Sequence, residues 1–419
     1  YLKDILSKER GVSFGKFDNN KKTYLLVSPC HYKSLIENLG LQTIYYILNK
    51  CQNTVAERSF TPEVSIKNHL KKNNLHILSL ESQTIPRDFK VIGFSFSNPL
   101  LLKDFFEWME LARISPLKEK RDKNDPLIIA GGMGIVNPEP YLPFIDVFFL
   151  GDSQNSIKKF NQLIQYKSKI KILKKAAKIP GIYVPRYSSS KEISNPIFED
   201  KIEILHSPRF ILDEASIIID RGCKFGCDFC EYYYCLNGKY IYYNFERIKN
   251  SIDYLSKKGV KKIYIYSASA GNHPKIKDIL RYIEKKNIIA ELQATRIEQL
   301  NEGMLSYFSK NLNHLPLNLD APSERVRKIV KKGSVSDDYI LEIAKKAYDK
   351  YKIKNFSIYY IINYPNETKK DREEIYNFLK RILAIGKNLS INLYINPLFP
   401  SPKTPLERCK MELPEVTYR

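Results

Sequence analysis

Short apolar runs alternate with longer segments of helical periodicity along the first half of the chain. Four runs are predicted as buried strands: residues 23–28, 91–97, 126–132 and 146–151. Apolar positions at helical spacing predict helices over residues 35–51 and around residues 102–113. Strands that alternate with helices indicate a parallel, doubly wound α/β sheet of the Rossmann-like type. Such sheets bind ligands at the carboxyl ends of their strands, so the candidate contact loops are residues 28–33, 95–98, 131–137 and 151–153.

A second set of strands follows a polar linker. Residues 187–195 are Ser-rich and lie between two prolines, which is typical of a loop between domains, and residues 201–212 are predicted as a short hairpin. Six further strands are predicted: residues 217–219, 263–267, 290–294, 315–319, 356–362 and 391–397. Helical stretches separate them, and this pattern fits a partial (β/α)6 TIM barrel. The predicted domains are residues 1–186, a linker over 187–214, a barrel over 215–406 and a C-terminal segment over 407–419.

Three cysteines gather on one loop after the first barrel strand. Cys223, Cys227 and Cys230 have the spacing C-x3-C-x2-C, which suits a metal or iron–sulfur site. A cluster that only transfers electrons normally takes four cysteines, so three would leave one iron open to a substrate. The alternative is a structural zinc site with Cys235 as fourth ligand. Structural zinc sites usually pair two short knuckles, and no second knuckle follows here.

The cysteine motif resembles the radical SAM signature, C-x3-C-x-aromatic-C, with Phe229 as the aromatic residue. The resemblance implies that Cys223, Cys227 and Cys230 are the catalytic metal ligands of a [4Fe–4S] cluster. In this family the open iron chelates S-adenosylmethionine, and an electron from the cluster releases a 5′-deoxyadenosyl radical that abstracts a hydrogen atom. The resemblance also implies a reducing partner such as ferredoxin or flavodoxin.

The same resemblance predicts which strand-end side chains contact S-adenosylmethionine. Arg296 follows the third strand and would bind the methionine carboxylate, because a guanidinium matches a carboxylate bidentately; the alternative is an exposed surface arginine. Ser267 follows the second strand, where the family often has a G-G-E-like segment and this chain has SASAG. Glu324 is open between ligand binding and the helix that Ser323 is predicted to cap. The remaining expected contacts are Phe229, Asp320 and Tyr364.

The first half resembles the cobalamin-binding domain that precedes many radical SAM barrels. The match lies in residues 126–141 and 146–153, and it implies these contacts to cobalamin: Ser28, Ser95, Gly131, Gly132, Gly134, Gly151 and Asp152. His31 is interpreted as a loop residue, because the D-x-H-x-x-G motif of a histidine ligand to cobalt is absent. A dinucleotide site is not expected, since no G-x-G-x-x-G follows the first strand. Residues 38–48 also resemble a related group of unassigned function without established cobalamin.

Charge and composition leave the partner open. The chain of 419 residues has 68 Lys and Arg against 46 Asp and Glu, a net charge of +22. A nucleic-acid partner is possible on this ground, but the lysines are spread throughout and no arginine-rich patch with interleaved aromatics stands out, so a composition bias is favoured. Seven irregularly spaced cysteines do not look like a secreted disulfide framework. With no long apolar run or signal peptide, a cytoplasmic protein without a membrane partner is expected.

Three functions follow from these patterns. The first is a cobalamin-dependent radical SAM C-methyltransferase that transfers methyl from methylcobalamin to an unactivated sp3 carbon of a protein or peptide, for example a glutamine of methyl-coenzyme M reductase. The second is a radical SAM RNA-modifying enzyme of the methylthiotransferase type, without cobalamin. True methylthiotransferases carry three further cysteines in the N-terminal domain, and only Cys30 and Cys51 occur there. The third is a non-enzymatic iron–sulfur scaffold, against which the polar strand ends argue.

Overall fold

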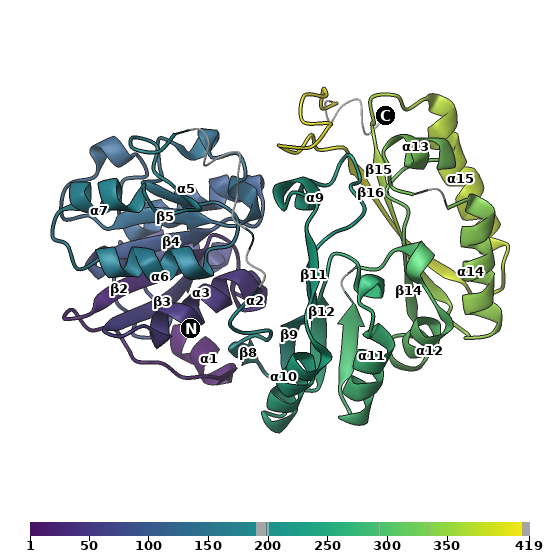
Figure 1. The fold of residues 1–419 in the computed structure, drawn as a ribbon, viewed down its shortest axis with the longest axis horizontal. Helices are drawn as coiled ribbons and strands as arrows, with labels where there is room; N and C mark the ends of the chain where they lie inside the picture. Colours follow the sequence, from purple (N-terminus) through teal and green to yellow (C-terminus); the bar gives the residue numbers. More distant parts are fainter. Residues whose placement is uncertain (190–197, 199–200, 293, 334, 413–419) are drawn as a thin grey trace. The chain divides into compact units, whose positions relative to one another are not determined.

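The computed structural model describes residues 1–189, 198, 201–292, 294–333 and 335–412. The chain divides into two compact units, Tyr1–Ser216 and Ile217–Arg419, whose elements are labelled in Figure 1. Most of the polar loop predicted at residues 187–195 lies outside the described residues. Among the described residues, no helix combines the length and the apolar character needed to cross a bilayer.

A six-stranded sheet in the order β3-β2-β4-β5-β6-β7 forms the centre of the first unit. All neighbouring pairs are parallel except β6 with β7. The strands are β2 (Lys22–Ser28), β3 (Thr54–Phe60), β4 (Val91–Ser95), β5 (Leu127–Gly131), β6 (Val147–Phe149) and β7 (Ile182–Tyr183). The four predicted strands are therefore present as β2, β4, β5 and β6, and β3 and β7 were not predicted.

Helices cover both faces of this sheet. Because side chains alternate along a strand, Tyr24 and Leu26 of β2 pack in one core cluster with α3, α6 and α7, and Leu25 and Val27 pack in the other with α5. The helices are α2 (Tyr32–Glu37), α3 (Leu39–Lys50), α4 (Val64–Lys72), α5 (Leu102–Ala112), α6 (Gln154–Leu163) and α7 (Lys169–Ala176). The helix predicted over residues 35–51 is present but divided in two, because Asn38 ends α2 and caps α3 by accepting from the Leu41 N–H.

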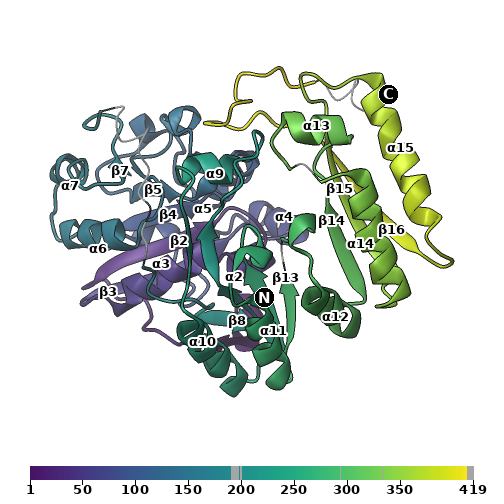
Figure 2. The ribbon, with the colours of Figure 1, turned by 45° about the vertical axis from the view of Figure 1, so that its right-hand side comes forward.

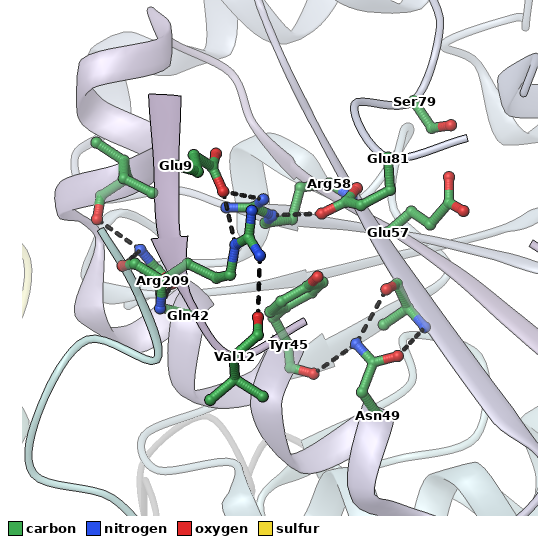
Figure 3. Close-up of polar contacts among 12 residues, drawn as sticks. Glu9, Val12, Gln42, Tyr45, Asn49, Glu57, Arg58, Ser79, Glu81 and Arg209 are labelled. Atoms are coloured by element: carbon green, nitrogen blue, oxygen red, sulfur yellow. Dashed lines mark hydrogen bonds and ion pairs between the residues drawn. The ribbon is translucent and has the colours of Figure 1, made fainter. Parts of the chain in front are cut away.

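Strand β3 is fully buried although it carries two charged residues. Arg58 belongs to a buried ion network: it donates to Glu9 Oε2 at 2.6 Å and to Glu81 Oε1 at 2.7 Å, and Arg209 donates to Glu9 Oε2 at 2.7 Å. Glu57 instead accepts from the Phe17 N–H and from the Ser82 hydroxyl, both at 2.7 Å. Figure 3 shows Arg58 between Glu9 and Glu81. Buried charges are tolerated when they are paired in this way. The network ties β3 to the N-terminal segment with α1 (Leu2–Lys8) and β1 (Glu9–Gly11), and to β8 (Arg209–Ile211).

The predicted hairpin before the barrel is wrong in its pairing. Strand β8 pairs antiparallel with β1 and, through Ile211 and Glu214, with β9 (Glu214–Ile218). Residues 201–207 form no strand. Strand β8 therefore finds its main partner near the start of the chain rather than in the adjacent sequence.

The second unit contains the six predicted strands and most of the predicted helices. Strands β12 and β13 are parallel, and so are β14, β15 and β16. The strands are β9, β12 (Lys262–Tyr266), β13 (Ile289–Leu292), β14 (His314–Asn318), β15 (Asn355–Ile362) and β16 (Ser390–Pro397). The intervening helices are α10 (Phe245–Lys257), α11 (Ile276–Lys285), α12 (Glu302–Asn311), α13 (Glu324–Ile329), α14 (Asp337–Asp349) and α15 (Lys369–Leu383). Helices α14 and α15 lie side by side along the strands β14–β16 (Figure 1; Figure 2).

A two-stranded ribbon follows β9 in the sequence and carries the cysteine loop. It consists of β10 (Asp220–Gly222) and β11 (Tyr240–Tyr242), which pair antiparallel. The cysteine loop and the short helix α9 (Glu231–Cys235) connect these two strands. Both ends of the loop are thereby fixed to the same two-stranded ribbon.

Candidate functional site

The cysteine loop begins at a glycine that no other residue could replace without a shift of the backbone. Gly222 has a φ of +81°, and a Cβ atom there would collide with the carbonyl oxygen of Lys239. The close approach lets β10 pair with β11, so that Cys223 leaves the ribbon directly beside the point where the chain returns. Glycine is the residue that accepts such a conformation at no steric cost.

Three consecutive tyrosines after the last cysteine hold the loop. The Tyr232 hydroxyl accepts from the Gly222 N–H at 3.3 Å, and the Tyr234 hydroxyl donates to the Gly226 carbonyl at 3.1 Å. The Tyr233 ring lies against Gly226, where an added Cβ would stand 3.1 Å from it. The contacts of these tyrosines are those of positioning residues.

The three thiols of the loop are free, and Cys227 is the buried one. Burial raises the pKa of the Cys227 and Cys230 thiols. The cations of Lys332 and Arg296 act in the opposite direction on Cys227. The charge of Cys223 raises the pKa of both thiols, and that of Cys227 also raises the pKa of Cys230, so the three sulfurs belong to one electrostatic site.

The donor set fits a polynuclear cluster better than a single ion. Within the described residues, no three His, Cys, Asp or Glu side chains converge where one metal ion could bind. In a cubane each thiolate binds a different iron, so its cysteines need not converge on one point. The four cysteines Cys223, Cys227, Cys230 and Cys235 therefore do not form a converging set of ligands for one zinc ion, which disfavours the four-cysteine zinc site.

Arg296 lies against the cysteine loop and is only 6% exposed, so the alternative of a surface arginine is wrong. Its Nη1 donates to Cys227 Sγ at 3.4 Å, and its guanidinium stacks on the Phe225 ring at 4.0 Å from the centroid. Its Nη2 pairs with Glu298 at 2.7 Å and also donates to the Lys332 carbonyl. The Nε is buried without a hydrogen-bond partner in the described part of the chain. The Nε–H of the guanidinium is therefore left for a ligand.

Asp320 and Tyr364 meet beside the same loop. The Asp320 carboxylate forms an ion pair with Lys332, and its carbonyl accepts from the Tyr364 hydroxyl at 2.7 Å. The Tyr364 ring lies 6.1 Å from that of Phe229, and both belong to one hydrophobic cluster. Burial raises the pKa of the Tyr364 hydroxyl far above its ordinary value, so it stays a neutral donor. The structure thus brings Asp320 and Tyr364 to Phe229 and the cysteine loop, as expected from the strand-end positions of Asp320 and Tyr364.

Ser267 points to an acid that sequence reasoning missed. Its hydroxyl donates to Asp220 Oδ2 at 2.8 Å, and the Tyr240 hydroxyl lies 3.3 Å from the same oxygen. Burial raises the pKa of Asp220 to about 7, although these two hydrogen bonds partly offset it. The sequence did contain a signal for Asp220, because an acid directly follows the apolar run 217–219 shortly before the cysteine motif. Phe225 and Lys332 were also missed.

Glu324 makes helix contacts instead. It pairs with Lys328 at 2.8 Å and accepts from the Asp337 N–H at 3.2 Å. Ser323 caps α13 as predicted, by accepting from the Val326 N–H. The contacts described for Glu324 therefore lie within α13 and at the start of α14, and they assign it no part in the cysteine site.

The predicted cobalamin residues lie at the carboxyl ends of β2, β4 and β5 and after β6. Ser28 is buried, and Ser95 Oγ accepts from Asn38 at 3.0 Å, which fixes the residue that caps α3. Gly151 is exposed, and Asp152 next to it is half-buried. His31 is exposed at the start of α2.

The three glycines after β5 differ in what surrounds them. A Cβ at Gly132 would collide with the Phe96 carbonyl, and one at Gly134 would stand 2.6 Å from the Asn98 backbone, so close packing of two loops explains both. A Cβ at Gly131 would approach nothing more closely than Phe149 Cβ, at 3.8 Å. Packing therefore does not require glycine at position 131, because a Cβ there would make only ordinary van der Waals contact with Phe149.

Comparison with known protein families decides the identity. A model described as "Radical SAM proteins, N-terminal" matches residues 40–185, and the model of the radical SAM superfamily matches residues 217–379. The chain belongs to the radical SAM superfamily. The superfamily model includes the cysteine loop, Arg296, Asp320 and Tyr364.

Several curated proteins are similar to this radical SAM chain. Uncharacterized protein MJ0966 of Methanocaldococcus jannaschii is 24% identical, over 82% of this chain and 74% of that protein. The tRNA-2-methylthio-N(6)-dimethylallyladenosine synthase of Buchnera aphidicola is 26% identical, over 76% of this chain and 72% of that enzyme. The threonylcarbamoyladenosine tRNA methylthiotransferase MtaB of Aquifex aeolicus is 24% identical over 47% of this chain, and the match spans about half (48%) of MtaB.

Two solved radical SAM structures share the fold of almost the whole chain. The radical S-adenosylmethionine methyltransferase TsrM of Kitasatospora setae, solved with its tryptophan substrate, has a TM-score of 0.63 at 14% identity, over 92% of this chain and 75% of TsrM. The cobalamin-dependent S-adenosylmethionine radical enzyme OxsB has a TM-score of 0.56 at 15% identity, over 93% of this chain but only 54% of OxsB. At these identities the likeness concerns the mixed α/β fold.

Proposed function

We propose that this chain is a cobalamin-dependent radical SAM C-methyltransferase, with a Rossmann-like cobalamin-binding unit before a partial (β/α)6 barrel. The likeness to TsrM and OxsB over more than nine-tenths of the chain carries the proposal. One of these proteins is named as a methyltransferase and the other as cobalamin-dependent. The parallel sheet that precedes the cysteine unit in the sequence supports the same proposal, because such sheets bind ligands at their strand ends. The acceptor would be an unactivated sp3 carbon.

Each expected cofactor has residues that would hold it. Cys223, Cys227 and Cys230 would bind a [4Fe–4S] cluster, and Arg296, with its unpartnered Nε, would bind the carboxylate of S-adenosylmethionine. Cobalamin would approach the backbone at Gly131. When bound, the cluster would supply the electron that cleaves S-adenosylmethionine, and cobalamin would supply the methyl group.

The chain's own residues would prepare this site in two ways. The cations of Arg296 and Lys332 beside Cys227 favour a thiolate there against the cost of burial. The Phe225 ring under the guanidinium and the Phe229–Tyr364 pair would place apolar surface beside the loop. Positive charge fixed beside the cysteines would stabilise an anionic cluster.

The proposed substrate is a protein or peptide residue, with a glutamine of methyl-coenzyme M reductase as the specific candidate and a ferredoxin or flavodoxin as electron donor. Mass spectrometry of that protein after incubation with the reconstituted enzyme tests the assignment. An increase in mass of one methyl group on a glutamine is the expected result.

Cobalamin binding is the first experiment. Protein reconstituted with hydroxocobalamin and desalted is expected to keep the corrin absorbance. Gly131→Ala should lower corrin retention without changing the melting temperature, because an added Cβ would make only ordinary contact with Phe149 and yet keep the ligand from the backbone. Gly15→Ala is the control, since a Cβ at Gly15 meets nothing within 4 Å. A colourless wild-type protein after desalting would contradict the proposal.

A second candidate is an RNA-modifying enzyme of the methylthiotransferase type. The names of the Buchnera and Aquifex relatives refer to tRNA, and a net charge of +22 would be compatible with a polyanionic partner. The N-terminal unit has only Cys30 and Cys51, fewer than the three further cysteines expected of that class. Tight tRNA binding that weakens steeply with salt, together with absent corrin binding, would favour this candidate.

A further inference from the structure

Asp220 is a buried acid with one unsatisfied oxygen beside the cysteine loop. The residue is 1% exposed and lies in β10, just before Cys223. Its Oδ2 receives the Ser267 and Tyr240 hydroxyls, whereas its Oδ1 is buried and has no hydrogen-bond partner in the described part of the chain. A buried carboxylate oxygen without a donor costs free energy. The position therefore requires an explanation beyond the packing of β10.

Three acids of the candidate site have basic partners. The pairs are Asp228 with Lys331 at 2.8 Å, Glu298 with Arg296 at 2.7 Å, and Asp320 with Lys332. Within the described residues Asp220 forms no ion pair. Its carboxyl group does feel the positive charge of Lys224, whose ammonium lies over the Tyr240 ring at 4.6 Å from the centroid. Asp220 thus keeps an acceptor that the protein itself does not use.

We propose that Asp220 accepts a hydrogen bond from the amino group of S-adenosylmethionine; this rests on the proposed function. An amino group supplies N–H donors, and a bond to a carboxylate is about twice as strong as one between neutral groups. The segment after β12, residues 267–271, contains no acid, and its Ser267 instead donates to Asp220. The Asp220 carboxylate, on β10, would therefore supply at the end of β12 the acidic group that residues 267–271 lack. Arg296, from the end of β13, would bind the carboxylate of the same amino acid moiety.

The test is equilibrium binding to protein that carries its cluster, kept anaerobic and without reductant so that no cleavage occurs. S-adenosylmethionine is compared with its deamino analogue, which lacks only the α-amino group, on wild type and Asp220→Asn. The variant should bind S-adenosylmethionine roughly 10- to 100-fold more weakly and should bind the analogue as wild type does. Asp278→Asn, on α11 of the same unit, is the control and should bind both as wild type does.

Each other outcome overturns a defined part of the inference. Equal affinity of wild type and Asp220→Asn for S-adenosylmethionine overturns it, and so does an equal loss for both ligands, because a role independent of the amino group is structural. If Asp220→Asn does not take up its cluster, the measurement on wild type still tests the inference, because equal affinity of wild type for the two ligands would overturn it. If wild type binds neither ligand, the proposed function itself fails.

Discussion

Arg296 donates a hydrogen bond from Nη1 to the sulfur of Cys227 at 3.4 Å. The two residues are far apart in the sequence, and the stacking of Arg296 on Phe225 brings the guanidinium to the cysteine loop. Hydrogen bonds and positive charge at a thiolate sulfur are among the means by which a protein tunes an iron–sulfur site. The pair therefore joins the expected cluster ligand to the expected binding residue for S-adenosylmethionine.

Replacement of Cys227 with Ala is expected to abolish the reductive cleavage of S-adenosylmethionine. The thiol is the buried one of the three, and two cysteines cannot hold a cluster with a single open iron. The measurement is 5′-deoxyadenosine formed under dithionite, which should fall to the level without enzyme. Cys409→Ala, outside the loop, is the control and should match wild type. Unchanged product from Cys227→Ala would rule out the cluster assignment.

Arg296→Lys is expected to weaken the binding of S-adenosylmethionine roughly tenfold. Lysine keeps the positive charge beside Cys227 but loses the planar fork, the free Nε and the stacking on Phe225. Equilibrium dialysis with the unreduced holoenzyme measures the effect, and iron content confirms that the cluster is retained. The exposed Arg281→Lys on α11 serves as the control. Binding equal to that of wild type would show that Arg296 serves the loop alone.

Tyr234→Phe is expected to loosen the cysteine loop without removing a cluster ligand. The variant loses the hydroxyl that bonds the Gly226 carbonyl, a contribution of about 0.5–1.5 kcal/mol. Transfer of iron from the reconstituted protein to a chelator should therefore be faster than in wild type. Tyr376→Phe, exposed on α15, should leave the rate unchanged. A rate equal to wild type in Tyr234→Phe would show that the loop does not depend on this tyrosine.

The sequence predicted the elements with regular apolar patterns and missed those whose burial depends on distant partners. Strand β3 was missed because Glu57 and Arg58 interrupt its apolar run. Both are buried because distant residues meet them: Glu9 and Glu81 pair with Arg58, and the Phe17 N–H and the Ser82 hydroxyl donate to Glu57. The hairpin predicted over residues 201–212 failed for the same reason, since β8 pairs with the N-terminal β1.

The site shows the same division. The cysteines and the strand-end residues could be read from spacing, because the carboxyl ends of parallel strands meet at one edge. The sequence could not predict the contributions of Lys332 and Phe225, because each depends on a contact with Arg296 that forms only in the folded chain. Glu324 had two readings from sequence, and its pairing with Lys328 favours the helix.

The network around Glu9 gives a prediction for stability and its pH dependence. Burial alone would raise the pKa of Glu9, but Arg58 and Arg209 together hold it below its ordinary value. Glu9→Gln leaves two buried arginines without their shared carboxylate, and is expected to lower the free energy of unfolding of the first unit by about 3–5 kcal/mol at neutral pH. Urea denaturation measures the difference from wild type. Glu110→Gln, largely exposed, should change stability by less than about 1 kcal/mol.

The sign of the pH effect follows from the direction of the pKa shift. A carboxyl whose pKa is lower in the folded than in the unfolded chain contributes stability above the unfolded value, about 4.3 for Glu, and that contribution is lost as the pH falls through the folded value. The difference between wild type and Glu9→Gln should therefore be constant above about pH 5 and shrink in more acidic solution. Glu81 shares Arg58 (Figure 3) but is present in both proteins, so its own titration largely cancels in the difference. A difference that grows as the pH falls would show that Glu9 is protonated in the folded protein and that the two arginines are neutralised by other groups.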